Sequence, residues 1–580
     1  MIIQAESLFS PKQILSQADW LVCNKESGQT LVPKDGYCMI SMTMQDIYPR
    51  ETSNFVFGYA SLSNRTGVFS FKRYDPEYQG LQDPNREITL LRNACGVMVH
   101  ETAHMFGLKH CIYYNCTMNG SNSYEESTRF LRNIKQSQIV KTISASTCSK
   151  VLVTGAYLIL DPKYEGIVLA TDARFHCKIN QSMAEVDKDF KFIINSPQFN
   201  KVIRVQVQKG ENDQEQFDIK PDDQFIGKCM YFLLQLIKLR EIEINDNQYE
   251  ITLIGDNSFY SQRDKFIDDF NYNSLSKQIL CDNPVDPHKK TGLGSSAALI
   301  TSFLASTLQL FQIIDIQSTK DHDLKLLHIY SQILNAFVQE KVGSGFDIAC
   351  SIYGSQIYRR FTNVKDLNDI VQKLMSNYQK GIICQDLELN QLIQTFENNF
   401  DYEHKVFTLN PLLDLCLIDV DSGSDTKVMV RQVLDWAKRQ QQDPSDQFSN
   451  ELFQALNHNY QTLAENLMIE NLTIQNKLDI KNKCFEIRSL IQQISKETEV
   501  AIEPSEQTKM LDQILSSLDQ VYYSAVPGAG GDDAIFILGE RENLHQLIQQ
   551  EFCDTYQDKK ISVLPVKVLK TQALMIQQSL

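Results

Sequence analysis

The 580-residue chain contains no apolar run that approaches the ~20 residues needed to span a bilayer. Its first residues, MIIQAESLFSPKQ, lack the basic stretch and the following apolar stretch of a secretory signal. Basic residues are too few to balance the acidic ones, because 56 Lys and Arg face 72 Asp and Glu and leave a formal net charge of −16. An acidic chain repels a nucleic-acid backbone, so we expect neither nucleic acid nor a membrane among its partners.

Cysteine is present but forms no compact framework, because the 14 Cys are spread along the chain. Such spacing is typical of reduced thiols, and we therefore expect a cytoplasmic location. The composition is 42% hydrophobic and 22% charged, which excludes a disordered or collagen-like chain.

Two regions of the chain differ in chemistry. The first has three of the ten His within eleven positions, whereas the second has three glycine-rich clusters. A polar stretch, NSYEESTRFLRNIKQSQIVKTISAST, separates them. We expect a first domain over 1–125, a junction over 126–148, and a second region from residue 149.

The second region alternates segments rich in β-branched residues with amphipathic segments, which predicts an α+β fold with helices covering a mostly antiparallel sheet. The expected strands are 150–161, 166–179, 413–420, 534–538 and 561–568. The expected helices are 293–311 and most of 362–400 and 430–520.

The segment VHETAHMFGLKH carries metal-ligating chemistry. His100 and His104 lie four residues apart, so on a helix both imidazoles reach one point. Glu101 lies beside them, where a carboxylate accepts a proton from zinc-bound water. Gly107 permits the turn that would bring His110 round as the third ligand and leave an open zinc position. The alternative is a helix with surface histidines.

The residues that follow, HCIYYNCTMNGSNSYEE, make this segment resemble the archaemetzincin family of zinc metalloproteases. The resemblance implies a Met-turn at Met118 and a second, structural zinc held in part by Cys111 and Cys116. No C-x-x-C pair follows Met118, and two thiolates cannot complete a four-ligand zinc site. We therefore expect a partial metzincin-like α/β domain with an incomplete second zinc site.

The segment KKTGLGSSAA (289–298) is a loop of small residues that leads into a helix. Backbone N–H groups of such a loop close on phosphate oxygens, and the helix N-terminus adds positive potential. It is not a Walker A loop, because no G-K-[ST] follows, and the polar, proline-containing residues before it exclude a dinucleotide fingerprint. It is not the glycine loop of a protein kinase, because no H-R-D or D-F-G set follows it. A plain helix N-cap remains the alternative.

Two further glycine-rich segments, KVGSGFDIACSIYGSQIYRRF (341–361) and SAVPGAGGDDAIFIL (524–538), occur further along the chain. With the 289–298 loop they resemble the three motifs of the GHMP kinases, and most closely the phosphomevalonate kinases. Four more segments agree in order: GAYLILDPKYEG (155–166), ITLIGDNSFYSQ (251–262), DVDSGSDTKVMV (419–430) and IEPSEQTKMLD (502–512).

This resemblance implies a two-lobed kinase with an ATP-binding lobe over 149–361 and a ferredoxin-like lobe over 362–580. It implies transfer of the ATP γ-phosphoryl group to 5-phosphomevalonate. ATP would be bound by Lys290, Gly292, Leu293, Gly294, Ser295, Ser296 and Ala297, with magnesium on Ser295 or Ser296. The substrate would be bound by Gly345, Gly528, Ala529, Gly530 and Gly531.

The resemblance assigns catalysis to Lys150 and Asp347. Lys150 would offset charge on the transferred phosphoryl group, and Asp347 would orient or deprotonate the attacking oxygen or mainly position Lys150. Asp347 is also suited to cap a helix. Two departures stand out: Thr147-Cys148-Ser149 replaces the usual A-P-G before the lysine, and Asp532 stands where the family has an aromatic residue or His.

Three interpretations of the chain follow from these two regions. The first is a phosphomevalonate kinase that uses ATP and magnesium. The second is a zinc metallopeptidase that carries the kinase-like region as a passenger. The third possibility is that both regions are genuine but were joined from neighbouring reading frames.

Overall fold

The computed structural model describes part of the first 138 residues and most of the rest. The described residues are 2–4, 23–24, 29–30, 39–47, 56–61, 66–80 and 86–106, followed by 139–579 without 183–189, 210–214, 245–246, 262–289, 317–320, 421–425, 442–447, 532–533, 551–560 and 565. The chain divides into two compact units, Met1–Gln138 and Ile139–Leu580.

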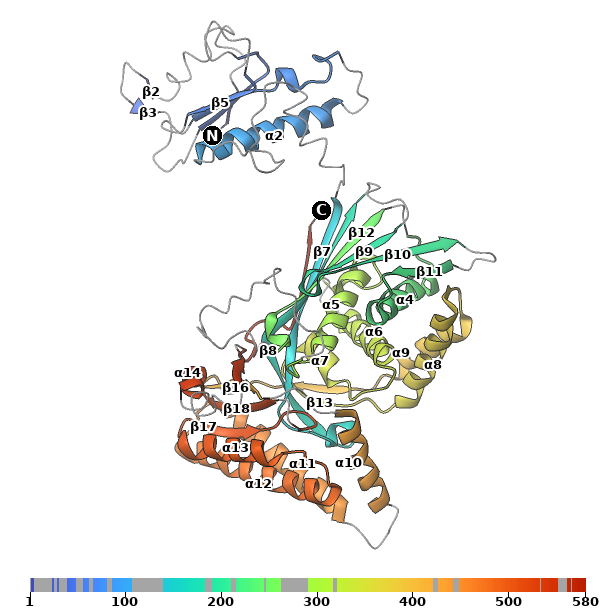
Figure 1. Ribbon diagram of the computed structural model, residues 1–580, viewed down its shortest axis with the longest axis vertical. Helices are drawn as coiled ribbons and strands as arrows, with labels where there is room; N and C mark the ends of the chain where they lie inside the picture. The colour runs from blue at the N-terminus through green and yellow to red at the C-terminus, as the bar shows by residue number, and fades with distance from the viewer. Residues whose placement is uncertain are drawn as a thin grey trace. The chain divides into compact units, whose positions relative to one another are not determined.

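The first unit is built on a four-stranded sheet with the order β1-β4-β6-β5. The helix α2 (Arg86–Met105) packs against β5 and β6, where Val97 joins Phe57 and Tyr74 in a small buried cluster (Figure 1). The strands of the unit are β1 (Ile2–Gln4), β4 (Met39–Thr43), β5 (Gly58–Ser61) and β6 (Thr66–Ser70), with a separate pair β2 (Cys23–Asn24) and β3 (Gln29–Thr30).

The second unit contains a ten-stranded sheet in which only β9 and β12 pair in parallel among the described strands. Its centre is the long antiparallel pair β7 (Ile139–Leu152) and β8 (Glu165–Ser182), and the C-terminal strand β20 (Leu574–Ser579) pairs with β7 (Figure 1). The others are β9 (Phe192–Ser196), β10 (Lys201–Lys209), β11 (Glu215–Lys220), β12 (Gln248–Gly255), β13 (Gln356–Arg359), β14 (Ile382–Ile383) and β15 (Glu403–Val406).

Helices cover one face of this sheet, and α5 (Ser295–Leu310) packs directly on β7 and β8 (Figure 1). Nearly every α5 side chain is buried, which explains why the sequence of this helix is apolar or small around its whole circumference. The other helices of the layer are α4 (Gln224–Leu239), α6 (Asp321–Gln339), α7 (Phe346–Tyr353), α8 (Val364–Lys380) and α9 (Leu387–Asn399).

A second sheet, antiparallel with the order β17-β18-β16-β19, forms the C-terminal lobe. Its strands are β16 (Leu413–Asp419), β17 (Val521–Ala525), β18 (Ala534–Glu540) and β19 (Ser562–Leu564). Its helices are α10 (Thr426–Gln441), α11 (Phe448–Met468), α12 (Ile474–Thr498), α13 (Ser505–Ser517) and α14 (Leu544–Ile548). The expected α+β class with a mostly antiparallel sheet is confirmed.

Three expected boundaries differ from the structure. The lobe boundary expected between 361 and 362 lies further along the chain, because β14, β15, α8 and α9 belong to the ten-stranded sheet and its helix layer, and the second sheet begins only at Leu413. The first unit ends at Gln138, inside the expected junction 126–148, and residues 139–148 are strand because they pair with β8 and, from residue 142, with β20. The strand expected over 150–161 ends at Leu152. Gly155 has a φ of +103° and packs against Gly166, so the chain turns there and forms the short helix η2 (Leu158–Leu160). No helix in the described part of the chain is long and apolar enough to cross a membrane.

Candidate functional site

Lys150 lies near the end of β7 and is held against the glycine loop. Its backbone N–H donates to the Leu293 carbonyl at 3.1 Å, and its Nζ donates to the Gly292 carbonyl at 2.8 Å. Burial lowers the pKa of Lys150 below its usual 10.5, while the negative charge of Asp347 opposes this shift. Strand and loop therefore hold a lysine whose charged form burial disfavours and the charge of Asp347 favours.

The glycine loop needs its glycines for two different reasons. Gly292 and Gly294 both have positive φ, at +74° and +81°. A Cβ on Gly294 would lie 3.0 Å from Lys150 Cε, whereas a Cβ on Gly292 would meet no atom of the described residues within 4 Å. The loop is thus packed on its lysine side and open in front of Gly292, which is the space that a phosphate group would need.

The loop continues into α5, whose first N–H groups have no acceptor within the helix. Leu293, Ser295 and Ala297 are buried and fix the loop to the core. Ser296 is half-buried, and its Oγ accepts a hydrogen bond from Lys290 Nζ at 3.2 Å. The structure therefore brings all seven residues predicted to bind ATP into one loop and helix start.

Asp347 lies in the first turn of α7, two residues after Gly345, which is the N-cap residue of the helix. Gly345 has a φ of +84°, and a Cβ there would lie 2.6 Å from the Gln332 side chain, so only glycine fits. Asp347 is half-buried and its Oδ1 accepts from the Ile348 N–H at 3.0 Å. The ring of the neighbouring Phe346 lies 5.5 Å from Lys150 Nζ, which places the start of α7 beside the lysine.

The third glycine cluster, 527–531, forms a tight turn against Ile502. Gly531 N–H donates to the Ile502 carbonyl at 2.9 Å, and a Cβ on Gly530 would lie only 2.0 Å from the same oxygen. The Tyr157 hydroxyl donates to the Ala529 carbonyl. Among the described residues, a Cβ on Gly528 would meet nothing within 4 Å, so they leave this side of the turn open. Asp532 lies outside the described residues.

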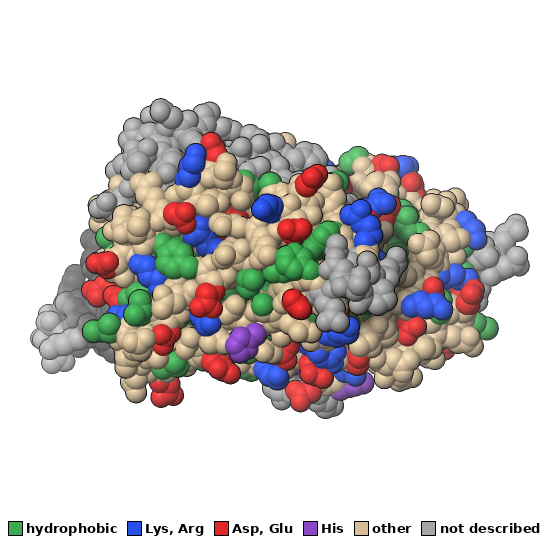
Figure 2. Space-filling model, turned by 90° about the horizontal axis from the view of Figure 1, so that it is seen from below, with side chains coloured by type: hydrophobic (Ala, Val, Ile, Leu, Met, Phe, Trp, Pro, Cys, Tyr) green, Lys and Arg blue, Asp and Glu red, His purple; other side chains and the backbone are tan. Residues whose placement is uncertain are grey.

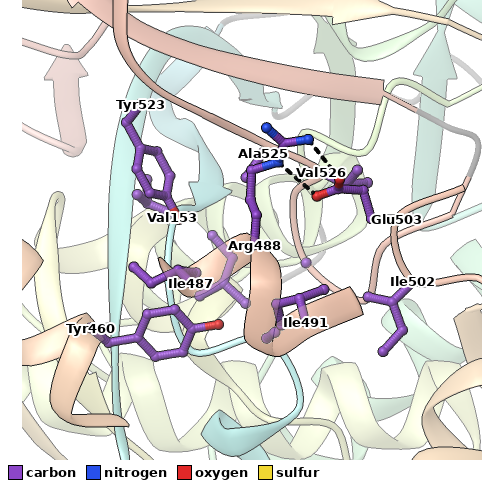
Figure 3. A pocket seen from close by; sticks show the side chains of 13 residues that line it. Val153, Tyr460, Ile487, Arg488, Ile491, Ile502, Glu503, Tyr523, Ala525 and Val526 are labelled. Atoms are coloured by element: carbon purple, nitrogen blue, oxygen red, sulfur yellow. Dashed lines mark hydrogen bonds and ion pairs between the residues drawn. The ribbon is translucent and has the colours of Figure 1, made fainter. Parts of the chain in front are cut away.

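A cavity of about 30 Å³ is lined by Gly528 of this turn and by Ile487, Arg488 and Ile491 of α12, of which Figure 3 labels the last three. Arg488 and Glu503 form a buried bidentate ion pair in its wall, with Nε–Oε2 and Nη2–Oε1 distances of 3.0 and 2.7 Å. Sequence reasoning missed this pair, because an Arg on an amphipathic helix is normally at the surface.

The altered motif before Lys150 has hydrogen-bond partners for each substituted side chain. Thr147 Oγ1 donates to the Ala298 carbonyl on α5 at 2.7 Å, and Cys148 Sγ donates to the Cys350 carbonyl on α7 at 3.3 Å. The Ser149 hydroxyl bonds to the Thr171 hydroxyl on β8. These side chains tie β7 to α5, α7 and β8.

On the face drawn in Figure 2, acidic and basic side chains are interspersed and form no single-sign patch. An anionic ligand needs local donors. The glycine loop, Lys150 and the start of α5 supply such donors.

The histidine motif lies on α2 of the first unit. His100 and His104 are half-buried, and their Nε2 atoms lie 3.1 Å apart. Two nitrogens bound to one tetrahedral zinc at 2.0–2.1 Å would be separated by roughly 3.3 Å, so the pair fits a shared ion. The Glu101 side chain and His110, Cys111, Cys116 and Met118 lie outside the described residues, and no three metal-ligating side chains gather among those described.

Comparisons with known proteins agree with this division of the chain. The family model for the GHMP kinases N terminal domain matches residues 265–355, and that for Peptidase family M54 matches 25–136. Phosphomevalonate kinase of Candida albicans is 31% identical over 412 residues, which cover 68% of this chain and 88% of that protein. Archaemetzincin-2 of Rattus norvegicus is 41% identical over 125 residues, which cover 18% of this chain and only 35% of that protein.

Solved structures agree on the fold. A crystal structure of a Listeria innocua protein has a TM-score of 0.50 and 14% identity, and it covers 75% of this chain and 99% of its own. At this identity the likeness concerns the fold alone.

Proposed function

This chain belongs to the phosphomevalonate kinase family, and we propose that it transfers the γ-phosphoryl group of ATP to 5-phosphomevalonate, giving 5-diphosphomevalonate and ADP. The reaction is a step of the mevalonate route to isoprenoids. The observation that carries the proposal is the meeting of Lys150, the open glycine loop and the start of α7 at one place.

ATP would lie with its phosphates in the glycine loop. The open space in front of Gly292 can hold phosphate oxygens. The first N–H groups of α5, which have no acceptor within the helix, can donate to them. Lys290 adds a positive charge at the loop entrance, where it already contacts Ser296. The hydroxyls of Ser295 and Ser296 are oxygen ligands of the kind that magnesium takes, and the ion would neutralise phosphate charge.

Lys150 would stabilise the charge that develops on the transferred phosphoryl group. The attacking oxygen belongs to a phosphate that is already anionic near neutral pH, so a strong base is unnecessary. Asp347 would then act chiefly by keeping Lys150 protonated, which agrees with its opposition to the burial-induced fall of the lysine pKa. Gly345 and the 528–531 turn would close on the substrate from two sides.

A coupled assay for ADP with 5-phosphomevalonate tests the function. We expect turnover by the wild-type chain, and about a thousandfold lower kcat in Lys150→Met and in Asp347→Asn with unchanged thermal unfolding. The exposed residues Lys163 and Asp369 offer matched controls, since Lys163→Met and Asp369→Asn should keep full kcat. No turnover by the wild-type chain would refute the function, and wild-type kcat in both site variants would refute the roles.

A second activity, zinc-dependent peptide hydrolysis, is favoured by the 3.1 Å approach of His100 and His104. These two residues and His110 would hold zinc, which would lower the pKa of a bound water, and Glu101 would accept its proton. Cys111 and Cys116 alone would leave a structural site incomplete. The chain spans about a third of the archaemetzincin-2 relatives, so this activity is a proposal of its own.

Metal analysis of the purified full chain tests the second activity. We expect one zinc per chain, lost in His104→Ala. Glu101→Ala should keep the zinc and lose cleavage of a peptide mixture, because its role is in proton transfer and not in ligation. A wild-type chain without zinc, or cleavage that survives Glu101→Ala, would contradict the proposal.

We also propose a cytoplasmic location for a single polypeptide. Among the cysteines whose side chains the structure describes, Cys95, Cys148, Cys177, Cys229, Cys350, Cys384 and Cys484 form no disulfide, which suits a reducing compartment. An immunoblot of fractionated cells with an antibody to the kinase unit would give a band near 66.5 kDa in the cytosol. A clearly smaller band would show that the two units are separate proteins, and a band in an organelle fraction would contradict the location.

A further inference from the structure

The turn before Asp347 is held by side chains at three successive carbonyl groups. Each carbonyl oxygen of 343–345 accepts a hydrogen bond from a buried side chain on another element. The pairs are Arg360 Nη2 to Gly343 O at 2.6 Å, Tyr358 OH to Ser344 O at 3.0 Å, and Gln332 Nε2 to Gly345 O at 2.8 Å. The backbone that leads into α7 is therefore fixed from outside the helix, and it fixes Asp347 in turn.

One of these donors has a second role. Arg360 Nη1 donates to the Leu160 carbonyl at 2.8 Å, at the end of η2. Tyr157 precedes η2, and its hydroxyl donates to the Ala529 carbonyl in the turn proposed to close on the substrate. A continuous path of short contacts thus runs from Ala529 through Tyr157, η2 and Arg360 to Gly343.

The segment between Tyr157 and Leu160 is short and well packed. Leu158 and Ile159 are buried, and the Ile159 N–H donates to the Gly155 carbonyl at 2.8 Å. A displacement at Tyr157 is therefore transmitted to the Leu160 carbonyl and not absorbed by a loose loop.

Arg360 is suited to carry this displacement further. Its side chain is 7% exposed, and burial lowers its pKa. Its guanidinium is planar, so the directions of Nη1 and Nη2 are fixed relative to each other. Both of the bonds described end on backbone carbonyls, which are acceptors whose positions depend on the turns that carry them.

We propose that Arg360 is a positioning residue that couples the 527–531 turn to the 343–347 turn, so that a substrate seated against the first sets the place of Asp347. The inference rests on the proposed roles of Asp347 and the 527–531 turn. Tyr157 is the second member of the path. Neither residue touches the reacting atoms.

A double-mutant cycle on the full chain tests the coupling. Arg360→Gln should lower kcat about tenfold and leave KM for ATP unchanged, because the loop at 290–298 is not on the path. Tyr157→Phe alone should lower kcat or raise KM for 5-phosphomevalonate by about threefold or more. In the Arg360→Gln background the same change should have almost no further effect, since the path is already interrupted. Effects that multiply independently would overturn the proposal.

Arg240 provides the matched control. It is a half-buried arginine at the C-terminal end of α4, outside the proposed path. Its Nη2 donates to the Tyr330 hydroxyl and to Glu397 Oε1, both at 2.7 Å. Arg240→Gln should lower Tm without changing kcat, and Tyr157→Phe should keep its full effect in that background. If Arg240→Gln also removes the effect of Tyr157→Phe, the coupling is a general loss of stability and the proposal fails.

Arg360→Lys serves if Arg360→Gln does not fold, because lysine keeps the charge and one of the two bonds. It should again abolish most of the effect of Tyr157→Phe, and independent effects would overturn the proposal. Asp347→Asn separates the two levels of inference. Full activity in Asp347→Asn would refute the role of Asp347, whereas loss of activity there with independent effects at Arg360 and Tyr157 refutes the coupling alone.

Discussion

Each unit has one of its predicted motifs on or at the start of a helix, α2 in the first unit and α5 in the second, and these two helices are packed very differently. On α5, fourteen of the sixteen residues are buried. On α2, Leu91 and Val99 are 66% and 58% exposed, as is Phe106 just after it at 57%. These three residues and the exposed Cys95 lie on one side of the helix by their spacing.

A motif can therefore be distinctive in the sequence without being held tightly by the residues packed around it. The histidine spacing on α2 and the glycine spacing before α5 are both distinctive in the sequence. In the described part of the chain, the α5 motif is fixed by its neighbours on several sides, through Lys150, Leu293 and the Ala298 carbonyl. Catalysis depends on such fixed geometry, so the kinase site has the stronger structural support.

We expect the largest effect when the chain is shortened at two different points, which tests whether the second unit is stable and active without the first. A chain of 139–580 should keep kcat within about twofold, because unit boundaries expose few contacts. A chain of 149–580 should lose cooperative unfolding, since it lacks the part of β7 that pairs with β20 and holds Arg174 through the Ser146 carbonyl. Circular dichroism melts measure the unfolding of each chain, and the ADP assay measures its kcat. Full activity of 149–580 would show that residues up to 148 act as the linker that the sequence predicts.

A smaller but better matched comparison uses the same substitution on both helices. Leu304→Ala on α5 should lower the free energy of unfolding by about 2–5 kcal/mol, because Leu304 is fully buried and a cavity remains. Leu91→Ala on α2 should change it by less than about 0.5 kcal/mol. Urea unfolding of the full chain measures each. A large loss in Leu91→Ala would mean that the exposed side of α2 has a partner in solution.

The local parts of the kinase site were predictable from the sequence. Positive φ and close packing select glycine at Gly294, Gly345 and Gly530, so the three clusters are visible as spacing alone. The start of α5 follows from Gly294 and the small residues after it. The two lobes and the zinc-type motif were identified through resemblance, and the comparisons support those identifications.

The parts that depend on distant pairing were not predictable. Arg360 meets Leu160 across 200 positions and Tyr157 meets Ala529 across 372, and no local pattern encodes such contacts. The start of β7 was missed because Ser146 and Thr147 look like linker residues. They are buried only once β8 and β20 pair alongside them.

Thiol reactivity compares the two units residue by residue. Cys95 on α2 is exposed, whereas Cys177 on β8 is fully buried and burial raises its pKa to about 12. At pH 8 the thiolate of Cys177 is scarce and shielded, so alkylation there should be about a hundredfold slower or more. Mass spectrometry of peptides after timed iodoacetamide labelling measures both sites. Equal rates would show that the second unit opens as readily as the first.

The smallest expected effect concerns the pH dependence of the kinase unit. The proposed role requires a charged Lys150, and burial lowers its pKa below 10.5. We therefore expect full kcat at pH values below the pKa of Lys150, and a fall in kcat as the pH rises through that pKa. In Lys150→Arg the remaining activity should lack this alkaline fall, because a guanidinium stays protonated beyond pH ~12. Lys163→Arg should keep the wild-type profile, since Lys163 is exposed and makes none of the loop contacts described above. If Lys150→Arg keeps the fall, another group titrates, and the electrostatic link between Asp347 and Lys150 is not what sets the working range of the site.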